Sequence, residues 1–473
     1  MCDTNMSSSS SSSSSKVTLQ SCYSVRPEEP TWCGCLPLSE WDQMGIITHV
    51  PTIYFYHPPQ NWLTSPSKIS TTLKESLSKV LVPFYPLAGR LQWKENGRFD
   101  LECNSLGVQF IEAQSSLALS DLNDFSPSSE YYCYLIPHVD YSVPIQDIPL
   151  IFVQLTNFKC GGVSIGLLVS HAVADGQSAL HFTSEWARVA RGETIKMTPF
   201  FDRSVVSLKS HCCNGVNEWE FDQPPLLLEK SNNVEERERK STVAILKVSK
   251  AHLEKMRKTA NECWEKEQPR NGRSFTRYET LTGHVWRSAC KARGHRNDQP
   301  TVLGVCVDWR NRVEPSLPKG YFGNATLDVM ATSFAGDLMS KPLGYASSRI
   351  REAIEKVSDE YVRQVNDYFK KQEDLTRFQD LYGMIGNVVA NDDKEPFYGN
   401  PNLCVVSWLT LPIYGLDFGW GKEVYMGPGT HEIDGDSLLL PSHEDDDGSL
   451  SVAICLQEVY MNAFKRHFYE DIV

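Results

Sequence analysis

The sequence lacks long apolar runs and any apolar leader. No apolar stretch approaches the roughly 18 residues that a membrane-spanning helix needs, so we expect no membrane partner. Residues 1–16 contain nine consecutive serines and no apolar segment, which argues against a secretory signal and predicts a disordered Ser-rich tail. The tail also lacks the Arg-rich, amphipathic character of a transit peptide. We therefore expect the protein to work in the cytoplasm.

Basic residues are fewer than acidic ones, and the sequence has neither a C-x-x-C motif nor a glycine-rich phosphate-binding loop. With 46 basic and 59 acidic residues the net charge is −13, which argues against nucleic acid as a partner. The 14 cysteines are scattered and never spaced as C-x-x-C, so we expect free thiols in a reducing compartment. Without a glycine-rich phosphate loop, nucleotide phosphates would have to be held at the surface by side chains.

What is present is a regular alternation of strand and helix patterns. The length of 473 residues favours two or three domains, and the alternation predicts an α/β fold. In the first part of the chain, residues 68–82 and 178–192 carry apolar positions at helical spacing. Residues 130–136, 148–158 and 161–173 have the apolar or alternating pattern typical of strands.

The pattern breaks between residues 196 and 235, which we predict to be a crossover loop between a domain of 17–195 and one of 236–473. The main elements expected in the second domain are helices at 276–294 and 342–375 and strands at 403–414 and 450–457. The acidic stretch 442–449 lacks the alternating ligands of a calcium loop, so we expect a solvated hairpin loop there.

The stretch LLVSHAVADGQSALHF (167–182) is the first candidate for chemistry. His171 closes a predicted strand, and Asp175 precedes Gly176 and a predicted helix. A metal pair would need both side chains on one helix and a third ligand, and neither is indicated. A histidine here could instead act as a general base near neutral pH, with Asp175 orienting it or bracing the loop. A strand-end histidine is more commonly structural, so the residues alone leave both interpretations open.

A second motif nearby suggests a serine hydrolase. Gly162, Ser164 and Gly166 match G-x-S-x-G, the nucleophile elbow, which requires a sharp turn from strand into helix at the serine. The strand alternation continues through Ser164 to Val169 without a break. We therefore expect an ordinary strand here and no elbow.

Two sequence signatures taken together favour a catalytic role for His171 over a structural one. Residues 171–176 match the H-x-x-x-D-G motif of the BAHD acyltransferases, a plant acyl-CoA-dependent family, and 417–421 match its DFGWG motif about 240 residues later. The stretches LSEWDQ (38–43), FYPLAGRL (84–91) and LPKGYFGNATLD (317–328) are similar to the family as well. The resemblance covers essentially everything after the Ser-rich tail, and it is greatest to the spermidine hydroxycinnamoyl transferases.

The resemblance implies a fold and a reaction. The family fold has two similar-sized mixed α/β domains, CoA-dependent acyltransferase-like, with a central channel. His171 would take a proton from the attacking nitrogen or hydroxyl and return it to the departing CoA sulfur, without an acyl-enzyme. Acyl-CoA is then a substrate, and neither a cofactor nor a metal is expected. The motif aspartate of the family pairs with an arginine, which corresponds to Arg310 here, so Asp175 would be a brace.

The second signature and the residues before it supply further candidates. Asp417 is the second candidate catalytic residue, although the family's DFGWG loop, with Gly419 and Trp420, is structural and remote from the chemistry. The tetrahedral oxyanion needs a hydrogen-bond donor. We expect it from Trp408 or Thr410, in the strand predicted before DFGWG, or from a backbone N–H.

Substrate contacts can also be predicted. Thr276 and Arg277 begin a predicted helix, where a helix start and a cation favour a CoA phosphate. Thr410 stands where shikimate-acylating relatives carry an arginine, which argues against an acidic acceptor. Asp328 stands where those relatives have a neutral residue and could hold a protonated amine, or could be a surface aspartate. His49 corresponds to a pocket-lining histidine, or could be a buried hydrogen-bonded one.

The favoured function is therefore transfer of a hydroxycinnamoyl group from CoA to the nitrogens of spermidine, by a protein expected to be a monomer. One alternative is the same chemistry on an alcohol such as shikimate or quinate. Another is a non-catalytic binding protein, and the intact His171, Asp175 and 417–421 argue against that.

Overall fold

A computed structural model describes most of the chain, with some segments left out. The residues described are 16–58, 65–122, 125, 132–210, 226–228, 235–236, 238–267, 273–380, 399–431, 433–442, 448–470 and 472. The predicted Ser-rich tail, the larger part of the predicted crossover loop and the core of the acidic loop lie outside these residues. Their predicted structure stays a prediction.

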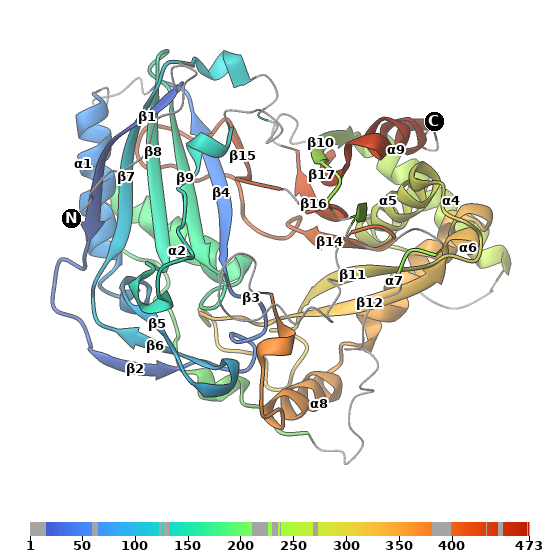
Figure 1. The fold of residues 1–473 in the computed structure, drawn as a ribbon, viewed down its shortest axis with the longest axis horizontal. Helices are drawn as coiled ribbons and strands as arrows, with labels where there is room; N and C mark the ends of the chain where they lie inside the picture. Colours follow the sequence, from blue (N-terminus) through green and yellow to red (C-terminus); the bar gives the residue numbers. More distant parts are fainter. Residues whose placement is uncertain are drawn as a thin grey trace.

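The first half of the chain builds a six-stranded mixed sheet in the order β1-β7-β8-β9-β4-β15 (Figure 1). Its strands are β1 (Val17–Val25), β4 (His49–Tyr56), β7 (Val108–Ser115), β8 (Ile151–Phe158), β9 (Val163–Ser170) and β15 (Tyr425–Pro428). A smaller sheet beside it joins β2 (Gly34–Pro37), β6 (Phe99–Cys103) and β5 (Arg90–Trp93).

Strand β9 lies inside the sheet and is buried on both faces. Its period-two set, which includes Val163 and Leu167, enters one core cluster, and Leu168 on the opposite face enters another. Each residue of β9 is buried. The apolar alternation predicted at 161–173 is thus confirmed as a strand.

Two helices cover this sheet and pack on each other: α1 (Pro66–Val80) and α2 (Gly176–Ala190). Helix α1 begins where the Ser65 side chain accepts a hydrogen bond from the Lys68 N–H and Pro66 occupies the first turn. The indole N–H of Trp186 in α2 donates to the Leu73 carbonyl in α1 at 3.2 Å. Both helices were expected from the apolar spacing, and both are confirmed.

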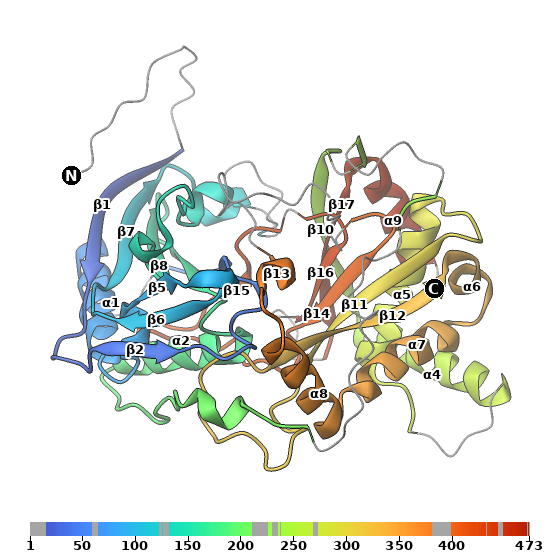
Figure 2. The same ribbon diagram turned by 60° about the horizontal axis from the view of Figure 1, so that its bottom comes forward.

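The second half builds another six-stranded mixed sheet, in the order β10-β17-β16-β14-β11-β12 (Figure 2). Its strands are β10 (Ser241–Val248), β11 (Pro300–Asp308), β12 (Thr326–Phe334), β14 (Leu403–Ser407), β16 (Asp436–Pro441) and β17 (Leu450–Gln457). Within the described residues, the α-helices of this half are α4 (Lys250–Glu267), α5 (Arg277–Arg293), α6 (Ala335–Ser340), α7 (Leu343–Lys356), α8 (Asp359–Lys370) and α9 (Glu458–Glu470). Helix α5 contacts both α7 and α9.

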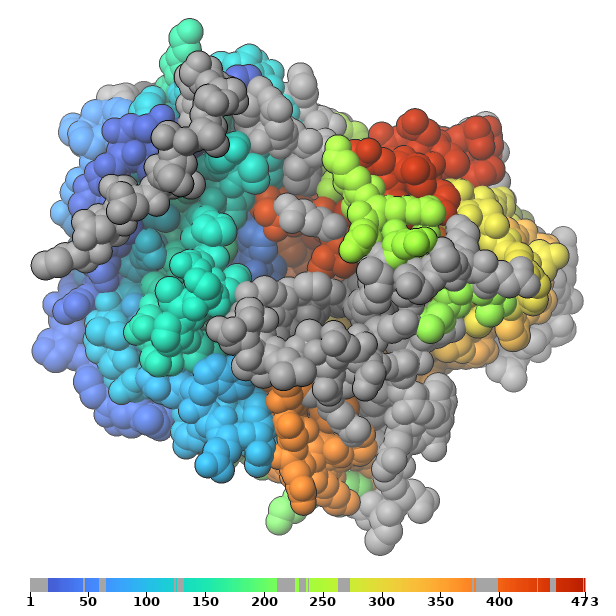
Figure 3. All heavy atoms as spheres, viewed as in Figure 1, coloured from blue at the N-terminus to red at the C-terminus, as the bar shows by residue number. Residues whose placement is uncertain are grey.

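The two halves lie side by side, with the early and late parts of the chain on opposite sides of the molecule (Figure 3). The second half also contributes strands to the first. Strand β15 comes from the second half yet pairs antiparallel with β4 of the first sheet. In the same way β13 (Gln379–Asp380) pairs with β3 (Gly45–Ile46). The domain division predicted from the sequence does not include this contribution.

Three expected elements differ in the structure. Residues 130–136 form no strand in their described part, where Tyr132–Leu135 is a short 3₁₀ helix. The single helix predicted at 342–375 is two helices, because Ser358 caps a new start by accepting from the Tyr361 N–H. The strand predicted at 403–414 ends at Ser407. Within the described residues, no helix is both long and apolar enough to cross a membrane.

Candidate active site

His171 stands at the corner between strand β9 and helix α2. The strand ends at Ser170, and the His171 N–H donates to the Thr48 carbonyl at 2.9 Å, which continues the pairing with the segment before β4. Helix α2 begins at Gly176, with Asp175 as its N-cap. The His171 side chain therefore lies just past the end of a strand that is buried along its whole length, and it is itself only half-buried.

The strand runs straight through Ser164, so the G-x-S-x-G match is not a nucleophile elbow. Ser164 pairs with Phe55 of β4 on one side and with Thr156 of β8 on the other. It is fully buried inside the sheet. The expectation of an ordinary strand is confirmed.

The carboxylate of Asp175 is turned toward the second half of the chain and is surrounded by donors. Arg310 contacts both oxygens, Nη2 to Oδ1 at 2.9 Å and Nη1 to Oδ2 at 2.8 Å. The N–H groups of Ser178 and Ala325 complete the set, each at 3.0 Å. The predicted contact between Asp175 and Arg310 is present, and it joins residues 135 positions apart across the two halves.

This arrangement fixes the charge of Asp175. Burial alone would raise the pKa of the carboxyl, but the Arg310 guanidinium and the two backbone donors outweigh it and hold that pKa below its ordinary value. Asp175 is 2 % exposed, and Arg310 is buried too. The geometry suits a brace between the halves, because Ser178 of the first half and Arg310 and Ala325 of the second half all donate to this one carboxylate.

Asp328 is a carboxylate of the second sheet that lies within electrostatic reach of His171. It lies on β12 opposite Cys306 of β11, and its carboxylate interacts electrostatically with His171. The side chain keeps an exposed surface, yet loss of hydration is the main cause of its raised pKa. The Cys306 thiol and the His171 ring lower that pKa, but by less.

A second carboxylate, which the sequence did not single out, lies near Asp328. Asp436 begins β16 and is paired with Cys404 of β14. Burial raises the pKa of Asp436, and its charge adds to the rise in the pKa of Asp328. His431 contacts Asp436 through Nδ1, 3.3 Å from Oδ2. No local spacing marks Asp436 as a site residue, because the parallel pairing of β14 with β16 is what brings it here.

His49 does not present a free ring to a substrate. Its Nε2 donates to the Pro149 carbonyl at 2.8 Å, and its Nδ1 lies 2.9 Å from the Tyr141 hydroxyl. Burial lowers the pKa of His49 to about 4, although the bond to Pro149 opposes this. With a neutral ring, Nδ1 accepts from Tyr141. The geometry favours the alternative of a buried, hydrogen-bonded histidine over an acceptor contact.

The DFGWG loop is built around its own aspartate. Asp417 Oδ1 accepts from the N–H groups of Gly419 at 2.7 Å and Gly421 at 3.0 Å. Both glycines have φ near 110°, a backbone conformation that residues with a side chain rarely adopt. Trp420 stacks on Phe418 with ring centroids 5.6 Å apart. These contacts favour a structural role for Asp417 over the catalytic candidacy that its motif suggested.

The two oxyanion candidates lie in a turn and not in a strand, because β14 has ended before them. Trp408 is half-buried, and Thr410 is exposed. The turn lies beside the His171 corner: a Cβ placed on Gly176 would sit 3.2 Å from Leu411 Cδ1. Their role as oxyanion donors stays a prediction.

The two CoA candidates begin helix α5. Thr276 is its N-cap and forms a capping box with Glu279, so its hydroxyl already accepts from the Glu279 N–H. Arg277 is partly exposed, and its Nε donates to Glu254 at 3.1 Å. A phosphate would therefore have to compete with Glu254 for this guanidinium.

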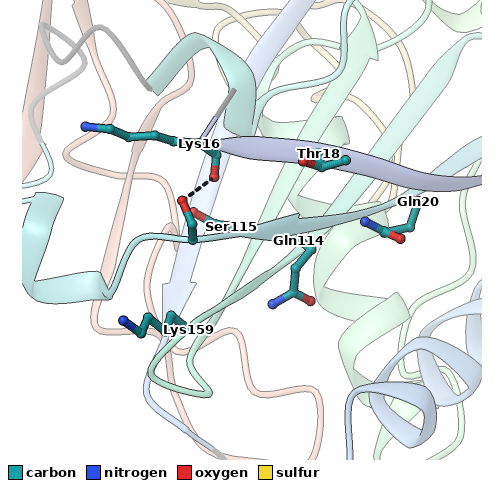
Figure 4. Close-up of a pocket in the computed structure, with 7 residues that line it drawn as sticks. Lys16, Thr18, Gln20, Gln114, Ser115 and Lys159 are labelled. Atoms are coloured by element: carbon teal, nitrogen blue, oxygen red, sulfur yellow. Dashed lines mark hydrogen bonds between the residues drawn. The ribbon is translucent and has the colours of Figure 1, made fainter. Parts of the chain in front are cut away.

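A separate surface hollow lies on the far edge of the first sheet (Figure 4). It is lined by Lys16, Thr18, Gln20, Gln114, Ser115, Ser116 and Lys159. These residues belong to β1, β7 and the adjoining turns, and β1 is the outermost strand on the side away from β15. The hollow contains none of the residues predicted for the site. Among the described residues, no group of three or more histidine, cysteine or acidic side chains could hold a metal ion.

Comparison with known proteins decides the family. The chain matches the group described as the Transferase family over residues 15–471, which include both signatures. The chain belongs to this family, the BAHD acyltransferases. BAHD enzymes use an acyl-CoA as a substrate and need no cofactor, as expected from the motifs.

Two BAHD relatives match almost from end to end. Hydroxycinnamoyl-CoA:piscidic acid hydroxycinnamoyltransferase of Actaea racemosa is 41 % identical over 463 residues, covering 96 % of this chain and 100 % of that protein. Shikimate O-hydroxycinnamoyltransferase of Nicotiana tabacum is 39 % identical over 457 residues, covering 96 % and 100 %. Neither name mentions spermidine, so the predicted likeness to spermidine enzymes gains no support from them.

The BAHD fold is also found among solved structures. The crystal structure of vinorine synthase superimposes with a TM-score of 0.70 at 24 % sequence identity, covering 94 % of this chain and 96 % of that one. At this identity the likeness shows the fold alone. The predicted fold class, two mixed α/β units, is confirmed.

Proposed function

We propose that this BAHD acyltransferase moves a hydroxycinnamoyl group from its CoA thioester to amine nitrogens of spermidine. The donor is supported by the two relatives, whose names both specify hydroxycinnamoyl transfer. The complete signatures at 171–176 and 417–421 favour an active enzyme over a binding protein. The acceptor rests on this chain's own residues.

The proposed reaction is a direct transfer. His171 removes the proton from the attacking nitrogen as the new N–C bond forms at the thioester carbonyl. The oxyanion is stabilised by Trp408, Thr410 or a backbone N–H. When the C–S bond breaks, His171 returns its proton to the CoA sulfur. Thr276 and Arg277 are proposed to meet the phosphates of CoA at the start of α5.

The observation that carries the acceptor proposal is the carboxylate of Asp328, which lies on β12 within electrostatic reach of His171. A polyamine can place a charged ammonium on Asp328 while a neutral nitrogen of the same molecule reaches His171. Asp436 adds negative charge near Asp328. An anionic acceptor would be repelled by the same two carboxylates, which favours an amine over an acid.

The second candidate is O-acylation of an alcohol such as shikimate or quinate. It is favoured by the relatives, because one is named for shikimate and the other for piscidic acid. In this case Asp328 would accept a hydrogen bond from an acceptor hydroxyl. The two candidates share His171 and the donor, and they differ only at the acceptor.

An acceptor comparison separates the candidates. Release of CoA thiol from caffeoyl- or feruloyl-CoA is measured with spermidine, shikimate and quinate in turn. We expect spermidine to be the fastest. Asp328→Asn should raise KM for spermidine by about tenfold to hundredfold, because a hydrogen bond to a charged group contributes about 1.5–3 kcal/mol.

The matched control is Asp337→Asn, which removes an exposed carboxylate of α6 that pairs with Lys341. It should leave KM unchanged. Turnover of shikimate or quinate without turnover of spermidine would reject the amine acceptor and establish the alternative. An unchanged KM in Asp328→Asn would reject the role given to that carboxylate.

The compartment is also a matter for proposal. The cysteines in the described part of the chain form no disulfide. This supports a reducing compartment, and we place the enzyme in the cytoplasm.

A further inference from the structure

Two stretches that resemble the family are 38–43 and 317–328, and apart from Asp328 and the Ala325 N–H they have no part in the site described so far. In the structure they meet beside the corner that carries His171. Asp42 comes from the first stretch and Asn324 from the second, and they are 0 % and 3 % exposed. Buried polar side chains at this depth are usually held by hydrogen bonds, and both are held so here, although Asn324 Oδ1 has no partner among the described residues.

Asn324 connects directly to the backbone of His171. Its Nδ2 donates to the His171 carbonyl at 2.8 Å and to Asp42 Oδ1 at 3.0 Å. Both partners are acceptors, so the side chain must offer two hydrogens at one position. An amide NH₂ does this, whereas a hydroxyl or a carboxylate of the same size does not.

Asp42 holds Asn324 and a second donor in place. Its Oδ1 also accepts from the Asn324 main-chain N–H at 2.9 Å, and its Oδ2 accepts from Arg203 Nε at 3.2 Å. The Ser39 hydroxyl and N–H satisfy the remaining positions on Oδ2 at 2.7 and 3.1 Å. Arg203 in turn donates through Nη2 to the Val173 carbonyl at 3.4 Å. Asp42 therefore links two donors that each hold a carbonyl of the 171–175 turn.

The imidazole of His171 depends on this turn for its position. The structure gives the ring no hydrogen bond to any described residue, so the hydrogen bonds of the His171 main chain fix the point from which the ring projects. The main chain is fixed by Thr48 at the His171 N–H and by Asn324 at its carbonyl. A shift of about 1 Å in a catalytic group can slow a reaction by about a hundredfold.

We propose that Asn324 and Asp42 are positioning residues that hold the His171 main chain, and thereby its imidazole, in register with the substrates. The inference rests on the proposed role of His171 as the base. It assigns a function to both stretches: LSEWDQ supplies the carboxylate, and GYFGNATLD supplies the amide that it orients. Asn324 belongs to the second half of the chain, whereas Asp42 and His171 belong to the first. The placement of the base therefore depends on the docking of the two halves.

The test uses Asn324→Ala and Asn324→Asp in the full-length enzyme. With any acceptor that the wild type turns over, kcat should fall by about ten- to a hundredfold in Asn324→Ala, while KM for both substrates stays within about twofold. Asn324→Asp keeps the shape but loses both donated hydrogen bonds, so its kcat should fall at least as far. If that variant does not fold, Asn324→Ala alone carries the test.

The matched control is Asn366→Ala. Asn366 is another fully buried asparagine whose Nδ2 donates to a main-chain carbonyl, that of Leu208, in a contact outside the site. This variant should lose stability but keep kcat per folded molecule. Folded Asn324→Ala with wild-type kcat would overturn the proposal.

A spectroscopic measurement keeps this test independent of the proposed function. In histidine-labelled protein, the His171 ring signal is assigned by its loss in His171→Ala. Asn324→Ala should move that signal, and Asn366→Ala should not. If the wild type turns over no acceptor, the proposed function fails, while an unmoved His171 signal in Asn324→Ala would overturn the positioning role.

Discussion

Asp175 carries its charge inside the protein because Arg310 and two backbone N–H groups surround it. Burial works against the charged form, and these partners outweigh burial, so the pKa lies below that of the unfolded chain. The pair therefore stabilises the fold fully above the unfolded value of about 3.9. That stabilisation is lost as the pH falls through the folded pKa.

Replacing Asp175 by Asn tests this pair. At pH 7 the free energy of unfolding should fall by about 3–5 kcal/mol, because Arg310 keeps a buried charge without its partner. The difference from wild type should narrow as the pH drops below about 4. Urea unfolding at both pH values measures it. The control, Asp298→Asn, removes an exposed partner of Arg296 and should cost less than about 1 kcal/mol. An equal loss at both pH values would mean that the pair is not ionised.

The DFGWG loop acts as an element of the first core, although it lies in the second half of the chain. Phe418 is 0 % exposed and contacts the Trp186 ring edge-on, with centroids 4.8 Å apart. The Tyr56 hydroxyl donates to the Leu416 carbonyl at 2.9 Å. The loop thereby attaches β4 and α2 to the strand β15 that follows it.

Phe418→Ala should therefore act on stability and not on chemistry. We expect a loss of about 3–5 kcal/mol in the free energy of unfolding, since the variant leaves a cavity beside Trp186. Denaturant unfolding measures this, and kcat per folded molecule should stay near that of the wild type. Phe334→Ala, which truncates a 54 % exposed side chain, is the control and should change stability little. A large loss of kcat at unchanged stability would contradict the structural role of the loop.

The apolar periods predicted the long elements, and local capping explains where they failed. The apolar spacing through 342–375 continues across the break between α7 and α8, because each helix buries apolar side chains at helical spacing. The N-cap at Ser358 therefore leaves no gap in the sequence pattern. Residues 403–414 are apolar beyond the end of β14, because the turn after it packs in the core. Apolar content alone does not distinguish a buried turn from a strand.

The residues of the candidate site that lie together in one sequence motif could be predicted from the sequence. His171 and Asp175 follow from their motif, and Arg310 follows from the family resemblance. Asp436 and Asn324 were not predicted, because strand order and the docking of the halves bring them to the corner. Spacing along the chain contains no information on either neighbour.

At the scale of the whole molecule, neither half is complete without the other. The core of the first sheet includes Phe322, Leu416 and Met426 from the second half of the chain. Strand β15 supplies that sheet's edge beside β4. The cut between domains that the sequence suggested would therefore remove part of one core.

A truncated chain tests this interdependence. A fragment of residues 1–195 should fail to show a cooperative unfolding transition, because it lacks β15 and the apolar side chains that close its core. Circular dichroism followed through urea unfolding provides the measurement, with the full chain as the reference. A cooperative transition in the isolated fragment would show that β15 and the other contributions of the second half are not required for folding.

The central claim is that His171 is the base for acyl transfer from CoA, and one substitution tests it most directly. CoA thiol release from a hydroxycinnamoyl-CoA is measured for wild type and His171→Ala with the wild type's best acceptor. The account predicts that kcat falls by about 10²- to 10⁴-fold in His171→Ala, while its unfolding curve stays close to that of the wild type. A folded His171→Ala enzyme with wild-type kcat would contradict it.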